Sequence, residues 1–284
     1  IMVELPGIKE PERVRKLLQG SANLEFWETY DLPEIYQQLV AADNMLATIL
    51  KSDDTAAEGS ETTTVEATSE VVADNAAAET TNDADSLLAK IGEDKPEAQA
   101  AQSMEEFAKL HPLFAVLQIN QYNGQLASGP VVGIADKKDM AKIDEYLNMK
   151  QVKDLLPRNL SLKWGVKAID EKEQFFYLYA IKKTNRDGTP ALGGDVVTDA
   201  NADFVQQAGR SEQVVDMVMN AEGAKAWARL TKENIGKAVA IVLDDMVYSA
   251  PNVQVEITGG RSQITGHFTP EEAKDLANVL KSGK

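Results

Sequence analysis

The chain has 284 residues, 43% of them hydrophobic, which is enough for one large domain or two smaller ones with real cores. It contains no cysteine, so disulfides and thiolate metal sites are excluded. Its net charge is −16. Such an acidic chain is repelled by the phosphates of nucleic acids, so we exclude nucleic-acid binding as its function. No apolar run approaches the roughly 18 residues of a membrane-spanning helix.

The first residues predict a strand, a helix and a second strand. Ile1–Leu5 is extended, Pro11 opens a short helix that carries Val14 and Leu17, and residues 22–26 alternate as a strand. The chain opens inside an extended segment, without an initiator Met or a signal peptide. We therefore expect a piece of a longer protein, with targeting and anchoring segments elsewhere.

An amphipathic helix is predicted over 32–49, with Asp31 as its cap. Its apolar positions step by three and four along the chain: Leu32, Ile35, Leu39, Ala42, Leu46 and Ile49. Such a stripe usually packs on its own domain, and the alternative is a partner helix for a second chain. We favour the first interpretation.

Residues 51–103 are rich in Ala, Thr, Asp and Glu, with 13 acidic residues against three basic ones and no aromatic residue. Such a segment buries too little apolar surface to offset the entropy of ordering it. We predict a flexible acidic low-complexity insert, with a short helix near 85–91. A solvated spacer is the favoured interpretation over a tail that binds a substrate or partner.

From Met104 the pattern returns to alternating helices and strands. Helices are predicted over 104–110, 152–156 and 221–235. A further helix is predicted after Asp136, its cap, with the apolar residues Met140, Ile143, Tyr146 and Leu147 on one side. Strands are predicted over 113–119, 131–135, 160–166, 174–181 and 214–219.

The last fifty residues carry the clearest turn and cap signals. Asp244-Asp245 lies between two apolar runs and predicts a hairpin, because Asp tolerates positive φ. Thr258-Gly259-Gly260 and Thr265-Gly266 are predicted breaks. Thr269, Pro270 and Glu272 occupy the N-cap, N1 and N3 positions of a final helix. Its predicted apolar stripe is Ala273, Leu276, Ala277 and Leu280.

Each motif that could indicate catalysis has a simpler structural explanation or lacks a residue that the chemistry requires. The only histidines, His111 and His267, have no metal-ligand spacing, and no nucleophile elbow or phosphate loop is present. Gly193-Gly194-Asp195 lacks the acidic and aromatic residues that would follow it in a nucleotide cyclase. Asp244-Asp245 is better explained as a turn than as paired carboxylates. We predict that the chain is not an enzyme and uses no cofactor or metal.

Several stretches resemble one family in the same order along the chain. They are VELPGIKEPERVRKLLQGSANLEF (3–26), GGDVVTDA (193–200), NAEGAKAWARLTKENIGK (220–237), AVAIVLDDMVYSAP (238–251), ITGG (257–260) and QITGHFTPEEAKDLANVL (263–280). They are similar to the first periplasmic domain of SecD, a subunit of the bacterial SecDF complex. Asp245 stands where the family usually has Gly, and His267 where it usually has Asn. Both departures suit turn positions.

The resemblance implies an α+β fold with two subdomains. A ferredoxin-like base, partly truncated here, would form from both chain ends, 1–28 and 258–284, which should lie side by side. Residues 29–257 would form a large inserted α/β head that includes the acidic insert. Gly259 and Gly260 are the candidate hinge between base and head, because backbone rotation at glycine is sterically cheap.

The resemblance also implies a function in protein export. The chain would be the periplasmic domain of an inner-membrane Sec translocase accessory subunit that captures emerging, unfolded secretory polypeptide and helps export driven by the proton gradient. SecF and SecYEG would be partners through membrane segments that this chain lacks. Candidate polypeptide contacts are the aromatic residues Phe175, Phe176, Tyr177 and Tyr179, of which one parity should be core.

Two other interpretations stay open at this point. One is a stand-alone envelope protein-binding or scaffolding module, engaged through the acidic insert and the 32–49 helix. The other is an enzyme built on the same fold, which a pocket with convergent acids or with His267 would favour.

Overall fold

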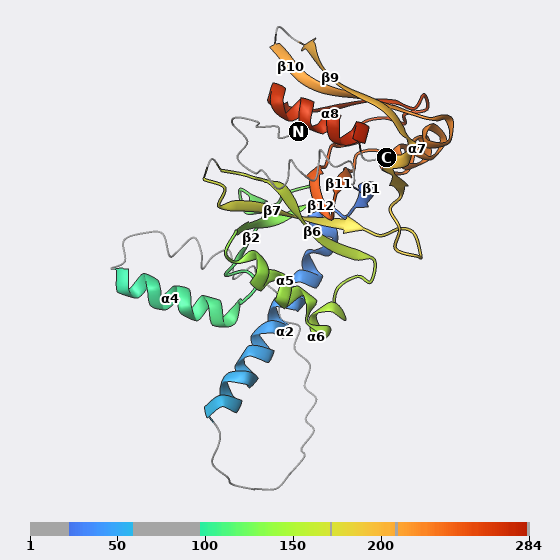
Figure 1. Ribbon diagram of the computed structural model, residues 1–284. Helices are drawn as coiled ribbons and strands as arrows, with labels where there is room; N and C mark the ends of the chain where they lie inside the picture. Colours follow the sequence, from blue (N-terminus) through green and yellow to red (C-terminus); the bar gives the residue numbers. More distant parts are fainter. Residues whose placement is uncertain (1–22, 59–96, 171, 208–209, 283–284) are drawn as a thin grey trace, which may run out of the picture.

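A computed structural model describes residues 23–58, 97–170, 172–207 and 210–282, and it has the mixed α+β architecture that the sequence predicts (Figure 1). The strands are β1 Leu24–Thr29, β2 Leu117–Ile119, β3 Gln121–Tyr122, β4 Gln125–Leu126, β5 Val131–Asp136, β6 Leu160–Ala168, β7 Phe175–Lys182, β8 Leu192–Gly193, β9 Val197–Gln207, β10 Arg210–Met219, β11 Val239–Leu243, β12 Met246–Ser249 and β13 Arg261–Phe268. The helices are α2 Leu32–Glu58, α4 Glu97–Leu110, α5 Met140–Asn148, α6 Lys150–Lys153, the short 3₁₀ helix η1 Gly194–Val196, α7 Ala221–Glu233 and α8 Pro270–Ser282. Within these described stretches, no helix is both long and apolar enough to cross a membrane.

The main sheet has eight strands in the order β2-β5-β7-β6-β12-β11-β1-β8, and part of it closes on itself. Strand β7 pairs with β5 along its first half, and at Ile181 and Lys182 it pairs with β1 instead. The strands β1, β7, β6, β12 and β11 therefore form a ring. Closing a sheet in this way removes the exposed edges of those strands.

Three apolar cores surround and fill this ring. The inner core is small and consists of Trp27, Ile181, Ala240, Val242 and Val247. On one side of the ring, α7, α8 and the three-stranded sheet β13-β10-β9 share a second core. On the other side, α2, α5 and α6 pack on β5, β6 and β7 in a third (Figure 1). The ring is thus the middle layer of the fold.

Helix α2 confirms the prediction of a core helix. Five of the six predicted apolar positions, from Leu32 to Leu46, are fully buried in the third core, and Ile49 is half-buried. Glu34, in the first turn, accepts a hydrogen bond from the N–H of Asp31 and one from the Nζ of Lys237, which joins the helix to the start of β11.

The acidic insert was predicted to be flexible apart from a short helix near 85–91, and the structure shows that helix also occupies both of its ends. Residues 51–58 are the last turns of α2, and residues 97–103 begin α4. An existing helix extends at little cost through residues such as Ala and Glu, because the costly nucleation step has already occurred. Residues 59–96, which include the helix predicted near 85–91, lie outside the described residues.

The strand predicted over 113–119 begins only at Leu117, because a buried carboxylate holds the preceding residues in turns. Asp43 of α2 is fully buried, and its Oδ1 accepts hydrogen bonds from the N–H groups of Leu113 and Phe114, at 2.9 and 3.4 Å. Its Oδ2 lies 2.7 Å from Nδ1 of His111. Burial raises the pKa of Asp43 above its usual range, even though these hydrogen bonds favour the charged form.

The Asp244-Asp245 turn is confirmed. It joins β11 to β12 as a two-residue hairpin in which both residues have positive φ, 46° and 72°. The side chain of Asp245 is exposed and accepts a hydrogen bond from Nζ of Lys163, which is itself almost fully buried. The carboxylates thus serve the turn and one ion pair.

The predicted break at Thr265-Gly266 is wrong, because β13 runs through it as one strand. Its pairing with β10 shifts there: Val214 lies opposite Thr265, and Gln213 opposite Phe268. Glycine in a strand often marks such a bulge. Gly266 therefore coincides with an irregularity in the pairing and not with the end of the strand.

The final helix confirms its predicted cap. The N–H of Thr269 donates to the Glu272 carboxylate at 2.9 Å, and the N–H of Glu272 donates back to the Thr269 hydroxyl at 3.2 Å. Its predicted apolar stripe is buried against β9 and β10.

The described residues nearest the two ends of the chain share one core, although strand β1 does not pair with strand β13. Of the predicted N-terminal base, 1–28, the structure describes residues 23–28, whose Leu24 and Phe26 lie in the same core as α8. The C-terminal segment, 258–284, pairs instead with β10. The boundaries between base and head stay a prediction.

Gly260 gives a first test of this packing. It has a positive φ of 64°, and a Cβ placed on it would lie 2.6 Å from the Cβ of Ala224. Gly260→Ala should therefore lower the free energy of unfolding by about 2–4 kcal/mol, measured by urea unfolding. Gly259 has open space around it, so Gly259→Ala should change it by less than about 0.5 kcal/mol. Equal effects would contradict this view of the turn.

Asp43 gives a second test. Asp43→Ala leaves the buried N–H of Leu113 without its acceptor, and we expect a loss of about 2–4 kcal/mol in the free energy of unfolding. Asp43→Asn keeps an oxygen at the Oδ1 position and should lose less than half as much. If both variants were as stable as the parent chain, the carboxylate would not be what holds this turn.

Candidate polypeptide-binding surface

The aromatic strand β7 presents alternate side chains to the core and away from it. Phe176, Leu178 and Ala180 are buried in the core beneath the sheet. Phe175 is 42% exposed, and Tyr177 is half-buried. The prediction that one parity is core is therefore confirmed, and the structure separates Phe176 from the other candidates.

A short loop fixes the exposed end of this strand. The Asp170 carboxylate accepts hydrogen bonds from the N–H groups of Gln174 and Phe175, both at 2.9 Å. The bond from Phe175 is the main reason why the pKa of Asp170 lies below its usual range. The carboxylate thus holds the chain at the point where the Phe175 ring leaves the sheet.

Ile169 extends the exposed surface, although the sequence analysis did not single it out. Its N–H donates to the carbonyl of Phe175 at 2.8 Å, so the two residues face each other across the end of the hairpin. Ile169 is 41% exposed. We call Ile169, Phe175 and Tyr177 the β7 strip. The signal in the sequence was Ile169 itself, an apolar residue directly before the turn at Asp170.

Tyr179 belongs more to the ring interior than to the strip. Its ring meets that of Tyr177 edge to face, with centroids 6.1 Å apart, and packs against the inner core. Burial, together with the neighbouring Tyr177, raises the pKa of Tyr179 to about 12. A Cβ on Gly165 would lie 3.2 Å from this ring, which shows how closely the ring covers β6.

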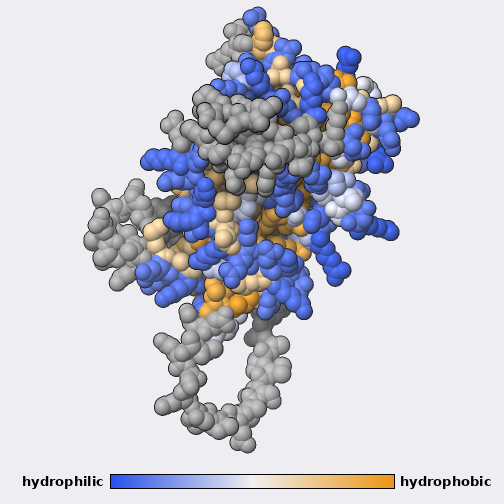
Figure 2. Space-filling model, viewed as in Figure 1, coloured by the Kyte–Doolittle hydropathy of each residue, from blue (hydrophilic) through white to orange (hydrophobic). Residues whose placement is uncertain are grey.

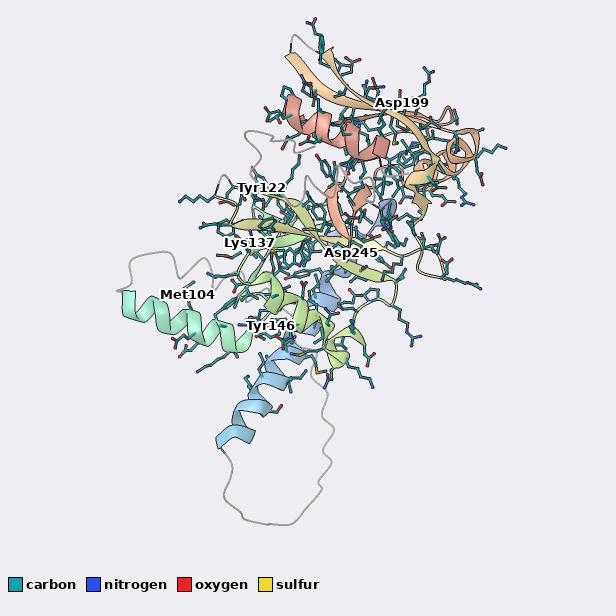
Figure 3. All side chains as sticks on the ribbon, in the orientation of Figure 1. Met104, Tyr122, Lys137, Tyr146, Asp199 and Asp245 are labelled. Atoms are coloured by element: carbon teal, nitrogen blue, oxygen red, sulfur yellow. The ribbon has the colours of Figure 1, made fainter. Side chains whose placement is uncertain are left out.

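Lys137 lies beside the same end of the sheet. Its Nζ is 5.9 Å from the centroid of the Phe176 ring, and Figure 3 shows Lys137 and Tyr122 near the end of the sheet that carries β2 and β7. Tyr122, at the tip of the β3–β4 hairpin, is 77% exposed. The Asn123-Gly124 turn that builds this hairpin, with φ of 51° and 74°, was a signal that the sequence analysis passed over.

The candidate hinge residues lie far along the chain from this strip, in the turn before β13. The carbonyl of Gly260 accepts a hydrogen bond from the N–H of Met219 at 2.8 Å. Gly260 is buried, whereas Gly259 is exposed. The two glycines therefore differ in how far their backbone can rotate without disturbing neighbours.

The chemical groups weighed in the sequence are spread apart. His111 pairs with Asp43, and the side chain of His267 lies outside the described residues. Across 23–58, 97–170, 172–207 and 210–282, no three Asp, Glu, His or Cys side chains gather as a metal would require. One small polar depression, of about 150 Å³, is lined by Glu28, Thr184, Asn185, Ala191, Ala226, Arg229, Leu230 and Glu233. None of the predicted contact residues lines it.

Two family models match this chain. Residues 170–284 match the P1 head subdomain of SecDF, and residues 1–31 match the N-terminal part of the P1 domain of the SecDF translocase subunit. The head model covers β7 and α8 together, so it does not divide the chain at 257/258.

Relatives with the name protein translocase subunit SecD match it as well. The protein from Rhodothermus marinus is 39% identical over 286 residues, which cover 100% of this chain and 39% of that protein. The protein from Rickettsia felis is 37% identical over 154 residues, which cover 54% of this chain and 27% of that protein. The chain thus spans about two-fifths or less of these relatives.

Solved structures of SecDF align at low TM-scores. One, described as a membrane component that enhances protein export, is 22% identical with a TM-score of 0.30, and the match covers 92% of this chain and 93% of that one. SecDF in a super-membrane-facing form is 27% identical with a TM-score of 0.31, covering 66% and 21%. Such scores carry no weight, so the assignment rests on the sequence matches. The chain belongs to the SecD family of protein translocase subunits.

Proposed function

We propose that this chain is the periplasmic P1 region of a SecD-type subunit of an inner-membrane Sec translocase, and that it captures secretory polypeptide as it emerges. The observation that carries the proposal is the β7 strip, where Ile169 and Phe175 expose about two-fifths of their surface on an otherwise packed sheet. Membership of the SecD family supports the setting in protein export.

An exposed apolar strip on a rigid sheet suits transient capture. Unfolded polypeptide offers apolar side chains every few residues, and burying one aromatic ring supplies a few kcal/mol at most. A strip of three residues would therefore bind weakly and release readily. Asp170 holds the backbone of Phe175 in place, so little backbone entropy would be lost on binding.

The proposal includes movement of a head against a base, without chemistry by this chain. A ferredoxin-like base formed from residues 1–28 and 258–284 would carry the head, 29–257, and Gly259 would be the pivot. SecF and SecYEG would be reached through membrane segments of the longer protein, which would also couple the movement to the proton gradient.

Capture can be tested with a labelled unfolded secretory protein. Phe175→Ser together with Tyr177→Ser should weaken its binding by about tenfold in fluorescence anisotropy, because the strip loses two aromatic rings. Phe204→Ser is the matched control, since Phe204 is 59% exposed on β9. Unchanged affinity of the double variant, with normal folding by circular dichroism, would overturn the assignment of the strip.

The pivot can be tested in the full-length protein. Substitution of Gly260 is expected to disturb folding, so the test uses Gly259→Val alone, which restricts the backbone at a position where an added Cβ has open space around it. We expect slower export in a vesicle translocation assay, while the purified P1 region keeps its melting temperature. Normal export by the Gly259→Val protein would remove Gly259 as the pivot.

A further inference from the structure

Strand β9 is the outermost strand of the three-stranded sheet, and one of its edges has no partner strand among the described residues. The strand order is β13-β10-β9, so β9 pairs with β10 alone. It is 11 residues long, whereas β2 and β8, the outermost strands of the main sheet, have three and two residues. A long open strand edge is a template to which a further strand can add.

The accessible part of this edge is the second half of β9. Ala200 is 3% exposed, whereas every residue from Asn201 to Gln206 is exposed or half-buried. Helix α8 packs against β9, and Figure 1 shows the end of the β9–β10 hairpin at the top of the molecule, above α8. Figure 2 shows hydrophobic residues among hydrophilic ones at that end. Residues 201–206 offer the length of an average strand, about five to six residues.

One hydrogen bond indicates which backbone groups lie along the open edge. The N–H of Phe204 donates to the carboxylate of Asp203 at 2.8 Å, so it points away from β10. The register with β10 has no shift between Ala200 and Gln207, and in such a ladder alternate residues direct both N–H and C=O toward the partner. The N–H and C=O groups of Ala202, Phe204 and Gln206 therefore lie on the open edge.

The spacing of these groups determines what can occupy the edge. Outward N–H and C=O groups recur every second residue, about 6.8 Å apart along the strand. Only an extended polypeptide matches this repeat with N–H and C=O groups of its own. At Phe204 the Asp203 carboxylate takes the place that a carbonyl of an added strand would have.

A second copy of this chain is the less favourable occupant. Two antiparallel β9 strands would bring their Asp203 carboxylates together along one edge, and each chain carries a net charge of −16. The other acidic residue of β9, Asp199, is paired with Lys281 of α8 at 2.8 Å. The strand contains no Lys or Pro, which often shield strand edges. The edge thus remains open to an extended segment that is not acidic.

We propose that residues 201–206 of β9 bind an extended segment of secretory polypeptide as an added strand. The segment pairs its main chain with Ala202, Phe204 and Gln206, and it displaces the Asp203 carboxylate from the N–H of Phe204. This inference rests on the proposed function. It adds a contact that recognises the backbone to the β7 strip, which recognises apolar side chains, so the edge would accept segments of unrelated sequence.

Two synthetic peptides of one sequence test the pairing. Both consist of about ten Thr, Val and Ser residues, and one carries N-methyl groups on two adjacent central residues, whose N–H groups would lie on opposite edges of the strand. We expect the unmethylated peptide to bind the 284-residue chain at least about tenfold more tightly in fluorescence anisotropy, because methylation removes donors and keeps strands apart. Equal binding of the two peptides would overturn the proposal.

Variants at Phe204 separate its N–H from its ring. Phe204→Pro removes the outward N–H and no hydrogen bond of the ladder with β10, so it should weaken binding of the unmethylated peptide about fivefold or more. Phe204→Ser is the matched control, because it loses the ring and keeps the N–H, and it should change binding less than about twofold. Equal effects of the two variants would contradict pairing through the main chain.

Asp203→Ala tests the same contact through a gain of binding, which misfolding cannot imitate. It removes the acceptor that competes for the N–H of Phe204, so the unmethylated peptide should bind about threefold more tightly. Asp203→Asn keeps an oxygen acceptor and should have a smaller effect. If Asp203→Ala left binding unchanged or weakened it, the inference would be wrong.

Amide hydrogen exchange, measured by NMR, reports the pairing residue by residue. The unmethylated peptide should slow exchange at Ala202, Phe204 and Gln206, and leave Asp203 and Val205 unchanged. If the first three amides were already protected without peptide, another segment of this chain would lie on the edge, and the proposal would fall.

The outcomes also distinguish this inference from the proposed function. If only Phe175→Ser with Tyr177→Ser weakened binding of an unfolded secretory protein, capture at the β7 strip would stand and the β9 edge would have no part in it. If neither peptide nor the unfolded protein bound, both proposals would fail. If Phe204→Pro instead turned a dimer into a monomer in analytical ultracentrifugation, a second copy would occupy the edge, and the inference would be wrong.

Discussion

Strand β1 is the constraint on which the rest of the structure depends. It is six residues long, yet it pairs with β11, with β7 and with β8. Its alternate side chains enter two cores: Phe26 meets Trp227 of α7 edge to face, and Trp27 fills the interior of the ring. At its end, the hydroxyl of Thr29 donates to the carbonyl of Ala238, and three residues later α2 begins.

Because β1 closes the ring, it also influences where the proposed binding surface, the β7 strip, lies. The end of β1 occupies the edge of β7 at Ile181 and Lys182, and β5 covers that edge up to Tyr179. The first residue of β7 therefore lies at the free end of the sheet, where Phe175 is exposed. In the same way α2 leaves the ring directly from β1, which places Asp43 and its partner His111 outside the sheet. The position of Phe175 at the end of the sheet, more than its residue type, makes its ring accessible.

Local patterns predicted much of this fold. The stripe of α2, the Asp244-Asp245 hairpin and the cap formed by Thr269 and Glu272 depend on neighbours within a few residues, so spacing alone identifies them. The ring closure could not be predicted, because it joins strands more than 150 residues apart through two residue pairs. The pair of Asp43 and His111, 68 residues apart, is hidden for the same reason.

Candidate site residues were only partly predictable. The alternation of β7 indicated that one parity would be core, but which parity depends on the helices that pack beneath the sheet. The exposure of Phe175 depends on where β5 ends, and this does not follow from Phe175 and its neighbours in the sequence.

The buried carboxylate of Asp43 has a consequence for how this domain can change in length. It fixes residues 111–114 to the middle of α2 directly, so the chain that connects the two need not hold them together. The entropy of closing a loop grows only with the logarithm of its length, so lengthening this connection costs little. Chains that differ in the number of residues between α2 and α4 can therefore keep the same contact between residues 111–114 and the middle of α2.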